Sequence, residues 1–205
     1  MKKVFIAAAA LFVAFGAQAQ ILSDATKYVK AGIALNRPAG EDAPDDYVKN
    51  QIGYDVVVGF QKDFAAPGLY WGMEAGLGTR GFKQAYHGDS GTYNLHNVKI
   101  TPIQIGFKVD FLDSWAVDFH LGAVASYDYT GNYVAVTDGS KTTFKYSKFK
   151  DDFHQFDFAL NPGITFWYGQ FGAEICWFRG FNTWVKTGDE KIYTSDFIIR
   201  LAYRF

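Results

Sequence analysis

Phe197-Ile-Ile-Arg-Leu-Ala-Tyr-Arg-Phe205 is the stretch that decides the fold, and the chain ends with it. In an extended strand, successive side chains point to opposite faces. One face then carries Phe197, Ile199, Leu201, Tyr203 and Phe205, and the other carries Ile198, Arg200, Ala202 and Arg204. A broad apolar face on a terminal strand promotes aggregation in water, but it suits a strand that closes a barrel in lipid. The ending therefore predicts a membrane-spanning β-strand.

The other end of the chain has the pattern of a secretory signal peptide. Met1-Lys2-Lys3 is basic, residues 4–16 are apolar, and Ala17-Gln18-Ala19 matches a cleavage site of the A-x-A type. The apolar run is shorter than the ~20 residues that a membrane-spanning helix needs. We therefore expect residues 1–19 to be removed after Ala19, which leaves residues 20–205 as one domain.

Composition excludes several classes of protein. Without Lys2 and Lys3, 18 of the 20 basic residues remain against 21 acidic ones, a formal charge of −3, so nucleic acid is not an expected partner. Cys176 is the only cysteine, which rules out an internal disulfide and a multi-cysteine metal site. No cofactor is expected. Aromatic residues at 19% and 21 glycines fit a β-barrel better than a helical membrane protein.

Alternating patterns predict eight strands, near 28–36, 51–63, 69–80, 97–111, 115–134, 153–167, 171–181 and 192–205. Short turns at 65–68, 112–114 and 168–170 alternate with long polar connections at 37–50, 81–96, 135–152 and 182–191. The fold class expected is all-β: an eight-stranded antiparallel transmembrane β-barrel with short periplasmic turns and longer external loops.

Periodicity alone does not say which face points inward. A soluble, secreted lipocalin-like barrel that binds a small apolar ligand would place the apolar set inside. The interior of an eight-stranded barrel is just wide enough for side chains to fill. The apolar set, rich in Phe, Tyr, Trp and Leu, would overfill that space, whereas the other set mixes glycines with charged residues. We therefore expect the apolar set to face lipid.

Two prolines interrupt predicted strands. Because a closed barrel has no edge strand to accommodate them, Pro102 and Pro162 predict bulges or locally broken pairing.

The face assignment predicts a charged interior. Charges in a narrow lumen must be paired or hydrated, so a salt-bridge network that plugs the barrel is expected rather than an ion path. The predicted lumen residues are Lys30, Asp55, Glu74, Arg80, Lys108, Asp110, Asp118, Asp128, Asp157, Glu174, Asp196, Arg200 and Arg204.

Three segments resemble the PorT-like outer-membrane β-barrel family. They are Gly68-Leu-Tyr-Trp-Gly-Met-Glu-Ala-Gly-Leu-Gly-Thr-Arg-Gly-Phe-Lys83, Ile100-Thr-Pro-Ile-Gln-Ile-Gly-Phe-Lys108 and Leu121-Gly-Ala-Val-Ala-Ser-Tyr127. The resemblance implies the fold and the outer membrane of a Gram-negative bacterium. The terminal Tyr203 and Phe205 resemble the assembly signal that the barrel-insertion machinery reads at the end of such barrels.

Function is expected in the external loops, as binding, adhesion, envelope integrity or support of a secretion complex. The expected partners are outer-membrane lipid, the insertion machinery and a protein of the envelope or of a secretion complex. Tyrosines and lysines between 133 and 150 suit contact with a glycan or an anionic surface. An outer-membrane enzyme is a remote alternative, because Asp151, Asp152 and His154 lie together without a nucleophilic serine motif.

Overall fold

A computed structural model describes residues 24–43, 48–64, 66–86, 89–186 and 191–205. The predicted cleavage site after Ala19 lies outside these residues. Strands dominate the fold, and no helix among the described residues is long and apolar enough to cross a membrane. The elements are β1 (Thr26–Ala39), β2 (Val48–Lys49), β3 (Gln51–Asp63), β4 (Leu69–Tyr86), β5 (Asp89–Leu112), β6 (Trp115–Thr137), β7 (Ser140–Lys145), η1 (Tyr146–Lys148), η2 (Lys150–Asp152), β8 (Phe156–Tyr168), β9 (Phe171–Gly180) and β10 (Tyr193–Arg204).

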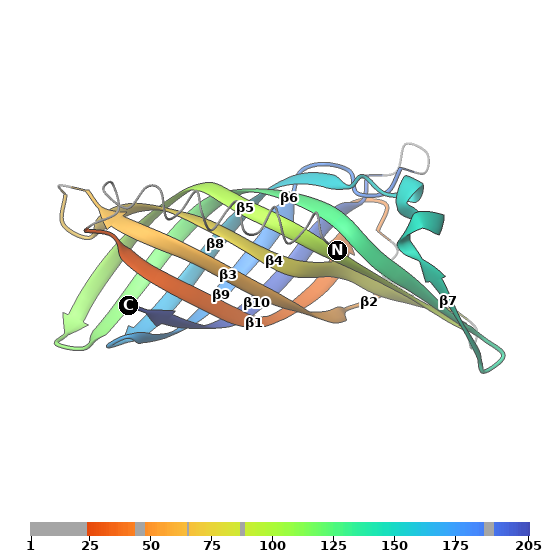
Figure 1. The fold of residues 1–205 in the computed structure, drawn as a ribbon, viewed down its shortest axis with the longest axis horizontal. Helices are drawn as coiled ribbons and strands as arrows, with labels where there is room; N and C mark the ends of the chain where they lie inside the picture. The colour runs from red at the N-terminus through yellow and green to blue at the C-terminus, as the bar shows by residue number, and fades with distance from the viewer. Residues whose placement is uncertain (1–23, 44–47, 65, 87–88, 187–190) are drawn as a thin grey trace.

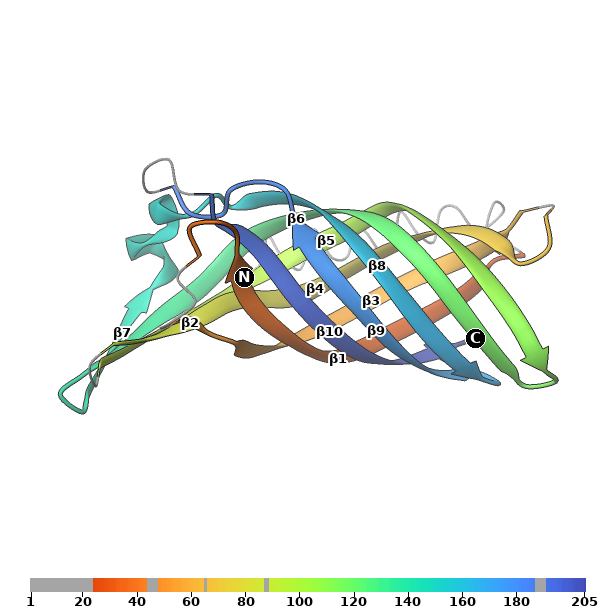
Figure 2. The same cartoon turned by 180° about the vertical axis from the view of Figure 1, so that it is seen from behind.

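Eight of the described strands form a closed antiparallel ring, in the order β4-β3-β1-β10-β9-β8-β6-β5, with β5 pairing back to β4. The terminal strand β10 joins β1 over a register that runs from Tyr28↔Arg204 to Ala39↔Tyr193. Figure 2 shows β8, β9, β10 and β1 side by side. The predicted fold class is confirmed, and the short turns lie where the sequence indicated.

The ring is apolar outside and polar inside. Along β10, Leu201 is 74% exposed and the adjacent Ala202 is 5% exposed, so the terminal strand has the two faces that alternation predicted. The outward side chains of β8 repeat the pattern with Phe158, Ile164 and Phe166. A lipocalin-like barrel would have the opposite arrangement, which excludes that alternative for the described ring.

The two prolines behave differently. Ile100 pairs with Ala125 and Ile103 with Ala123, so Thr101 and Pro102 together face one residue of β6 and form a β-bulge, as predicted. At Pro162 the predicted disruption is locally broken pairing and not a bulge: Pro162 pairs with Leu121 in unbroken register with β6. On the β9 side the register is the same before and after it, and only the pairing is interrupted.

Beyond the ring, the far ends of β4, β5 and β6 continue as a sheet extension that β2 and β7 border; we call this extension the ribbon. Figure 1 shows it at the end of the long axis opposite the C-terminus. Within the predicted polar loop 81–96, residues 81–86 are instead strand paired with residues 89–94, from Gly81↔Asn94 to Tyr86↔Asp89. Loop 135–152 likewise contains β7, η1 and η2. Burial of aromatic side chains on one face of the ribbon explains why these polar-looking segments stay extended.

Candidate functional site

Most of the predicted lumen charges are buried inside the ring. Ten of the thirteen are at most 6% exposed, and they come from seven of the strands. They are Lys30, Asp55, Glu74, Arg80, Asp118, Asp128, Asp157, Glu174, Asp196 and Arg200.

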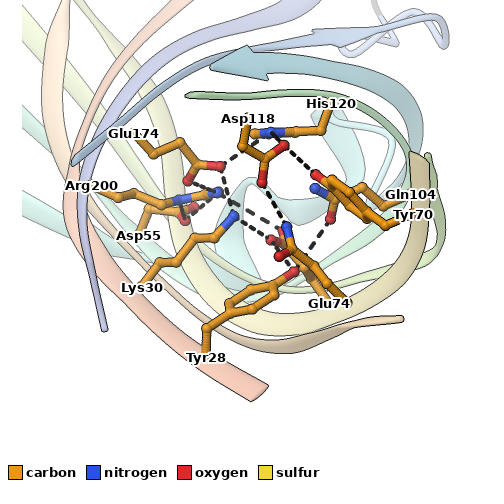
Figure 3. A network of polar contacts seen from close by, with 11 residues as sticks. Tyr28, Lys30, Asp55, Tyr70, Glu74, Gln104, Asp118, His120, Glu174 and Arg200 are labelled. Carbon is orange, nitrogen blue, oxygen red and sulfur yellow. Dashed lines mark hydrogen bonds and ion pairs between the residues drawn. The ribbon is translucent and has the colours of Figure 1, made fainter. Parts of the chain in front are cut away.

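Glu174 is the centre of the lumen network (Figure 3). Its Oε1 accepts a hydrogen bond from Lys30 Nζ at 2.8 Å and lies 3.0 Å from Nε2 of His120. Its Oε2 accepts from Arg200 at 2.9 Å. Both oxygens are therefore used, as a buried carboxylate requires.

Lys30 and Arg200 connect Glu174 to two further carboxylates. Lys30 Nζ also donates to Glu74 at 2.8 Å, and Arg200 donates from Nε and a terminal nitrogen to Asp55, each at 2.7 Å. Lys99 forms a second, close ion pair with Asp55. The resulting chain of charges joins strands β1, β3, β4, β5, β9 and β10 across the lumen.

Two tyrosines extend the network toward the short turns. Tyr28 donates to Glu74 at 3.0 Å, and Tyr70 donates to Asp118 at 2.5 Å. Glycines leave space for their rings: a Cβ on Gly106 would lie 2.2 Å from the Tyr70 hydroxyl, and one on Gly59 would lie 2.8 Å from that of Tyr28. The pairing of small residues with long ones is what fills an eight-stranded interior.

A second cluster surrounds Arg80 nearer the ribbon. Arg80 donates to the hydroxyl of Ser126 at 2.7 Å and lies 3.6 Å from carboxylate oxygens of Asp128 and Asp157. Thr194 donates to Asp157 at 2.5 Å. The single guanidinium thus faces two carboxylates, nearer the ribbon than the Glu174 network.

Lys108, Asp110 and Arg204 lie on the inward face, opposite Asp118, Ala116 and Tyr28 respectively, but outside the buried network. The side chain of Asp110 is 66% exposed, and its nearest cation, Lys108, is 3.8 Å away. Arg204 donates to the carbonyl of Gly169 and covers the ring of Trp167. All three lie at the short-turn end of the ring, near the ends of β5 and β10.

Several members of the network were missing from the sequence-based set. His120, Gln104 and Gln61 belong to the polar faces that alternation defines, and Tyr70 shares a face with Glu74, so the signal was present in the pattern. Lys99 was hidden, because the bulge at Pro102 shifts the alternation of β5 by one residue.

The paired lumen charges fill and brace the ring. Among the described residues, no group of three or more His, Cys, Asp or Glu has the geometry to hold a metal ion. Asp151, Asp152 and His154 lie at the ribbon end, and all three are exposed. Their backbones tie this segment to a neighbouring one, since His154 N–H donates to the carbonyl of Trp184 and the Asp152 carbonyl accepts from Lys186.

The inner face of the ribbon is an aromatic ladder across four strands. Phe82 stacks on Tyr93 at 4.8 Å, Tyr93 on Tyr133 at 4.3 Å, and Tyr133 on Phe144 at 5.8 Å between ring centroids. The side chains of Phe149, Phe153 and Trp184 cover the ladder. Burial in this cluster raises the pKa of the Tyr93 phenol, which therefore stays neutral. The ladder fixes the ribbon as an ordered sheet rather than a loop.

The outer face of the ribbon is basic. Lys49 and Lys83 lie directly opposite one another, and the row continues through Thr92 and Val134 to Thr143. Lys141 and Lys145, two positions to either side of Thr143, share this face. All four lysines are exposed, and none has an ion-pair partner within the described part of the chain. The outward positions of the described ribbon strands include no acidic residue.

No protein-family model matches the chain, and no curated protein matches it in sequence. The resemblance to the PorT-like family therefore stays a prediction.

Solved structures of small outer-membrane barrels share the strand arrangement. The attachment invasion locus protein Ail of Yersinia pestis, solved in complex with the heparin analogue sucrose octasulfate, is 12% identical over 88% of this chain and 99% of its own, with a TM-score of 0.43. Neisserial surface protein A is 12% identical over 88% of this chain and 99% of its own, with a TM-score of 0.46. The N-terminal barrel of Pseudomonas aeruginosa OprF is 8% identical over 87% and 97%, with a TM-score of 0.37. Such values describe similarity of fold and assign no ligand.

Proposed function

We propose that the mature chain, residues 20–205 after cleavage at Ala19, is an integral protein of the outer membrane of a Gram-negative bacterium. The support is the outward face of the ring, which offers lipid a continuous apolar surface while the charges lie inside. The short turns face the periplasm and the ribbon faces the outside of the cell. Tyr203 and Phe205 at the end of β10 are read by the barrel-insertion machinery.

The protein acts through the ribbon, as a binding surface for an anionic partner. The single observation that carries this function is the basic outer face, on which Lys49, Lys83, Lys141 and Lys145 are exposed together. Like charges placed directly opposite in a sheet are destabilising, so the pair Lys49 and Lys83 costs folding stability unless a ligand neutralises it. The protein is neither an open channel nor an enzyme, and service to a secretion or envelope complex would use the same surface.

The experiment compares two triple variants of the mature protein in lipid nanodiscs. Lys83, Lys141 and Lys145 are changed to Gln in one variant; the matched control changes Lys148, Lys150 and Lys186, which are exposed at the same end but off the outer face. Binding to dextran sulfate is measured at rising salt concentration.

The face variant should bind at least about tenfold more weakly, a loss of about 1.4 kcal/mol. The control should remain close to the parent protein, and salt should weaken binding by the parent because exposed charges are screened. An equal loss in both variants would show that net charge alone attracts the polymer. If the parent protein does not bind dextran sulfate, the proposed function is wrong.

A further inference from the structure

We propose that the free edge of β7 accepts an extended acidic segment of a partner protein as an additional β-strand. The inference rests on the proposed function, because it assigns a partner to the same ribbon.

β7 is an open edge of the sheet. Within the described part of the chain it pairs with β6 alone, from Asn132↔Lys145 to Thr137↔Ser140, and all six of its residues are exposed. A strand paired on one side leaves the N–H and C=O groups of alternate residues unbonded on the other. Recognition by strand addition uses these groups for affinity and alternate side chains for specificity.

A tight turn holds the edge in place. Asp138 and Gly139 both have positive φ, 49° and 76°, and connect the paired residues Thr137 and Ser140. This is a two-residue hairpin of the Asp-Gly type, whose twist matches that of the flanking strands. The edge is therefore already ordered. Most of the conformational entropy lost on binding is that of the incoming strand.

The two faces of β7 define the chemistry of the added strand. On the outer face, Lys141 and Lys145 flank Thr143, so the neighbouring positions of a partner strand favour acidic, small polar and acidic side chains in turn. On the inner face Phe144 is 41% exposed and stacks on Tyr133 from one side only among the described rings. An aromatic residue opposite Phe144 would continue the ladder.

The same lysines argue against pairing with a second copy of this chain. Antiparallel pairing of β7 with β7 would bring lysines of one copy beside lysines of the other, which is destabilising. Edge lysines are a common protection against self-association. An acidic strand is attracted where a second copy is repelled, so the edge selects its occupant by charge.

The test uses fluorescent peptides and the mature protein in nanodiscs. The parent peptide contains the core Glu-Phe-Thr-Thr-Glu, written to pair antiparallel with residues 141–145. Two further peptides have the same side chains but carry N-methyl groups on either the odd or the even backbone nitrogens, which removes hydrogen-bond donors from one edge of the strand at a time. Affinity is measured by fluorescence anisotropy, beside dextran sulfate binding by the same sample.

Strand addition predicts that one methylated peptide binds at least about tenfold more weakly than the parent while the other is nearly unchanged. Phe144→Ala should weaken the parent peptide severalfold and leave dextran sulfate binding intact. Equal affinities for all three peptides would reduce the contact to charge alone and overturn the inference. So would binding of dextran sulfate without binding of the peptide, an outcome that leaves the basic face as a polyanion site. If neither the parent peptide nor dextran sulfate binds, the proposed function itself is wrong.

Discussion

Replacing Glu174 by Gln should destabilise the barrel far more than a change of similar size at its rim. The amide keeps the volume of the side chain but removes the charge that Lys30 and Arg200 share. Both carboxylate oxygens accept from cationic or imidazole nitrogens, so either orientation of the amide places an NH₂ group against a donor. Charge-assisted hydrogen bonds contribute about 1.5–3 kcal/mol each.

The expected cost is about 3–5 kcal/mol, the usual penalty for leaving buried charges without a partner. It should fall near the lower end, because Glu74 still accepts from Lys30 and Asp55 still accepts from Arg200. Adding Lys30→Met should recover part of the loss, since the excess cation is then absent and Arg200 and Lys99 still face the carboxylates of Glu74 and Asp55.

The free energy of unfolding is obtained by urea titration of protein folded into lipid vesicles, followed by tryptophan fluorescence. Asp110→Asn is the control: its side chain is 66% exposed, and the change should alter stability by no more than about 0.5 kcal/mol. If Glu174→Gln costs no more than Asp110→Asn, water screens the lumen charges, and the ring is not plugged by paired side chains.

Three further outcomes follow from the structure. Leu201→Arg should destabilise the folded protein by ~2–4 kcal/mol if the site lies at the bilayer midplane and by less nearer the interface, as measured by the same titration. An unchanged free energy of unfolding would show that Leu201 does not face lipid. Deleting Phe205 should slow assembly into membranes, followed by the fraction of heat-resistant folded protein on gels, while the urea midpoint of protein already folded stays nearly unchanged. Deleting Pro102 should leave the barrel able to fold, because Thr101 and Ile103 then face Val124 and Ala123 in regular alternation and Lys99 stays inward; complete loss of heat-resistant folded protein would contradict the register.

Much of the ring was predictable because one physical pattern repeats in every strand. In β10 the alternation of Leu201 and Ala202 already separates lipid from lumen, and Glu174 and Arg200 follow from the same rule on neighbouring strands. The pattern fails where the backbone changes register. Pro102 signals a bulge, but the sequence does not say how many residues it adds, so the inward direction of Lys99 became visible only in the structure.

The ribbon was missed for a different reason. Segments 81–96 and 135–152 are polar on the outer face and aromatic at only a few inner positions. Their average hydrophobicity is therefore that of a polar loop. The dipeptide Asp138-Gly139 is a strong hairpin signal inside the second of these segments. The partners that bury Tyr93, namely Phe149 and Phe153, come from a distant part of the chain. No local sequence pattern predicts such a contact.

Labelling of single cysteines on intact cells tests the central claim most directly. In a Cys176→Ala background, cysteine replaces Thr143 on β7, Leu201 on the apolar face of β10 or Ala202 in the lumen, and living Gram-negative cells that express each variant are treated with a membrane-impermeant maleimide. The account predicts rapid labelling at Thr143 and none at Leu201 or Ala202. Labelling at Leu201, or protection of Thr143 until the outer membrane is opened, would contradict a lipid-facing barrel with an external ribbon.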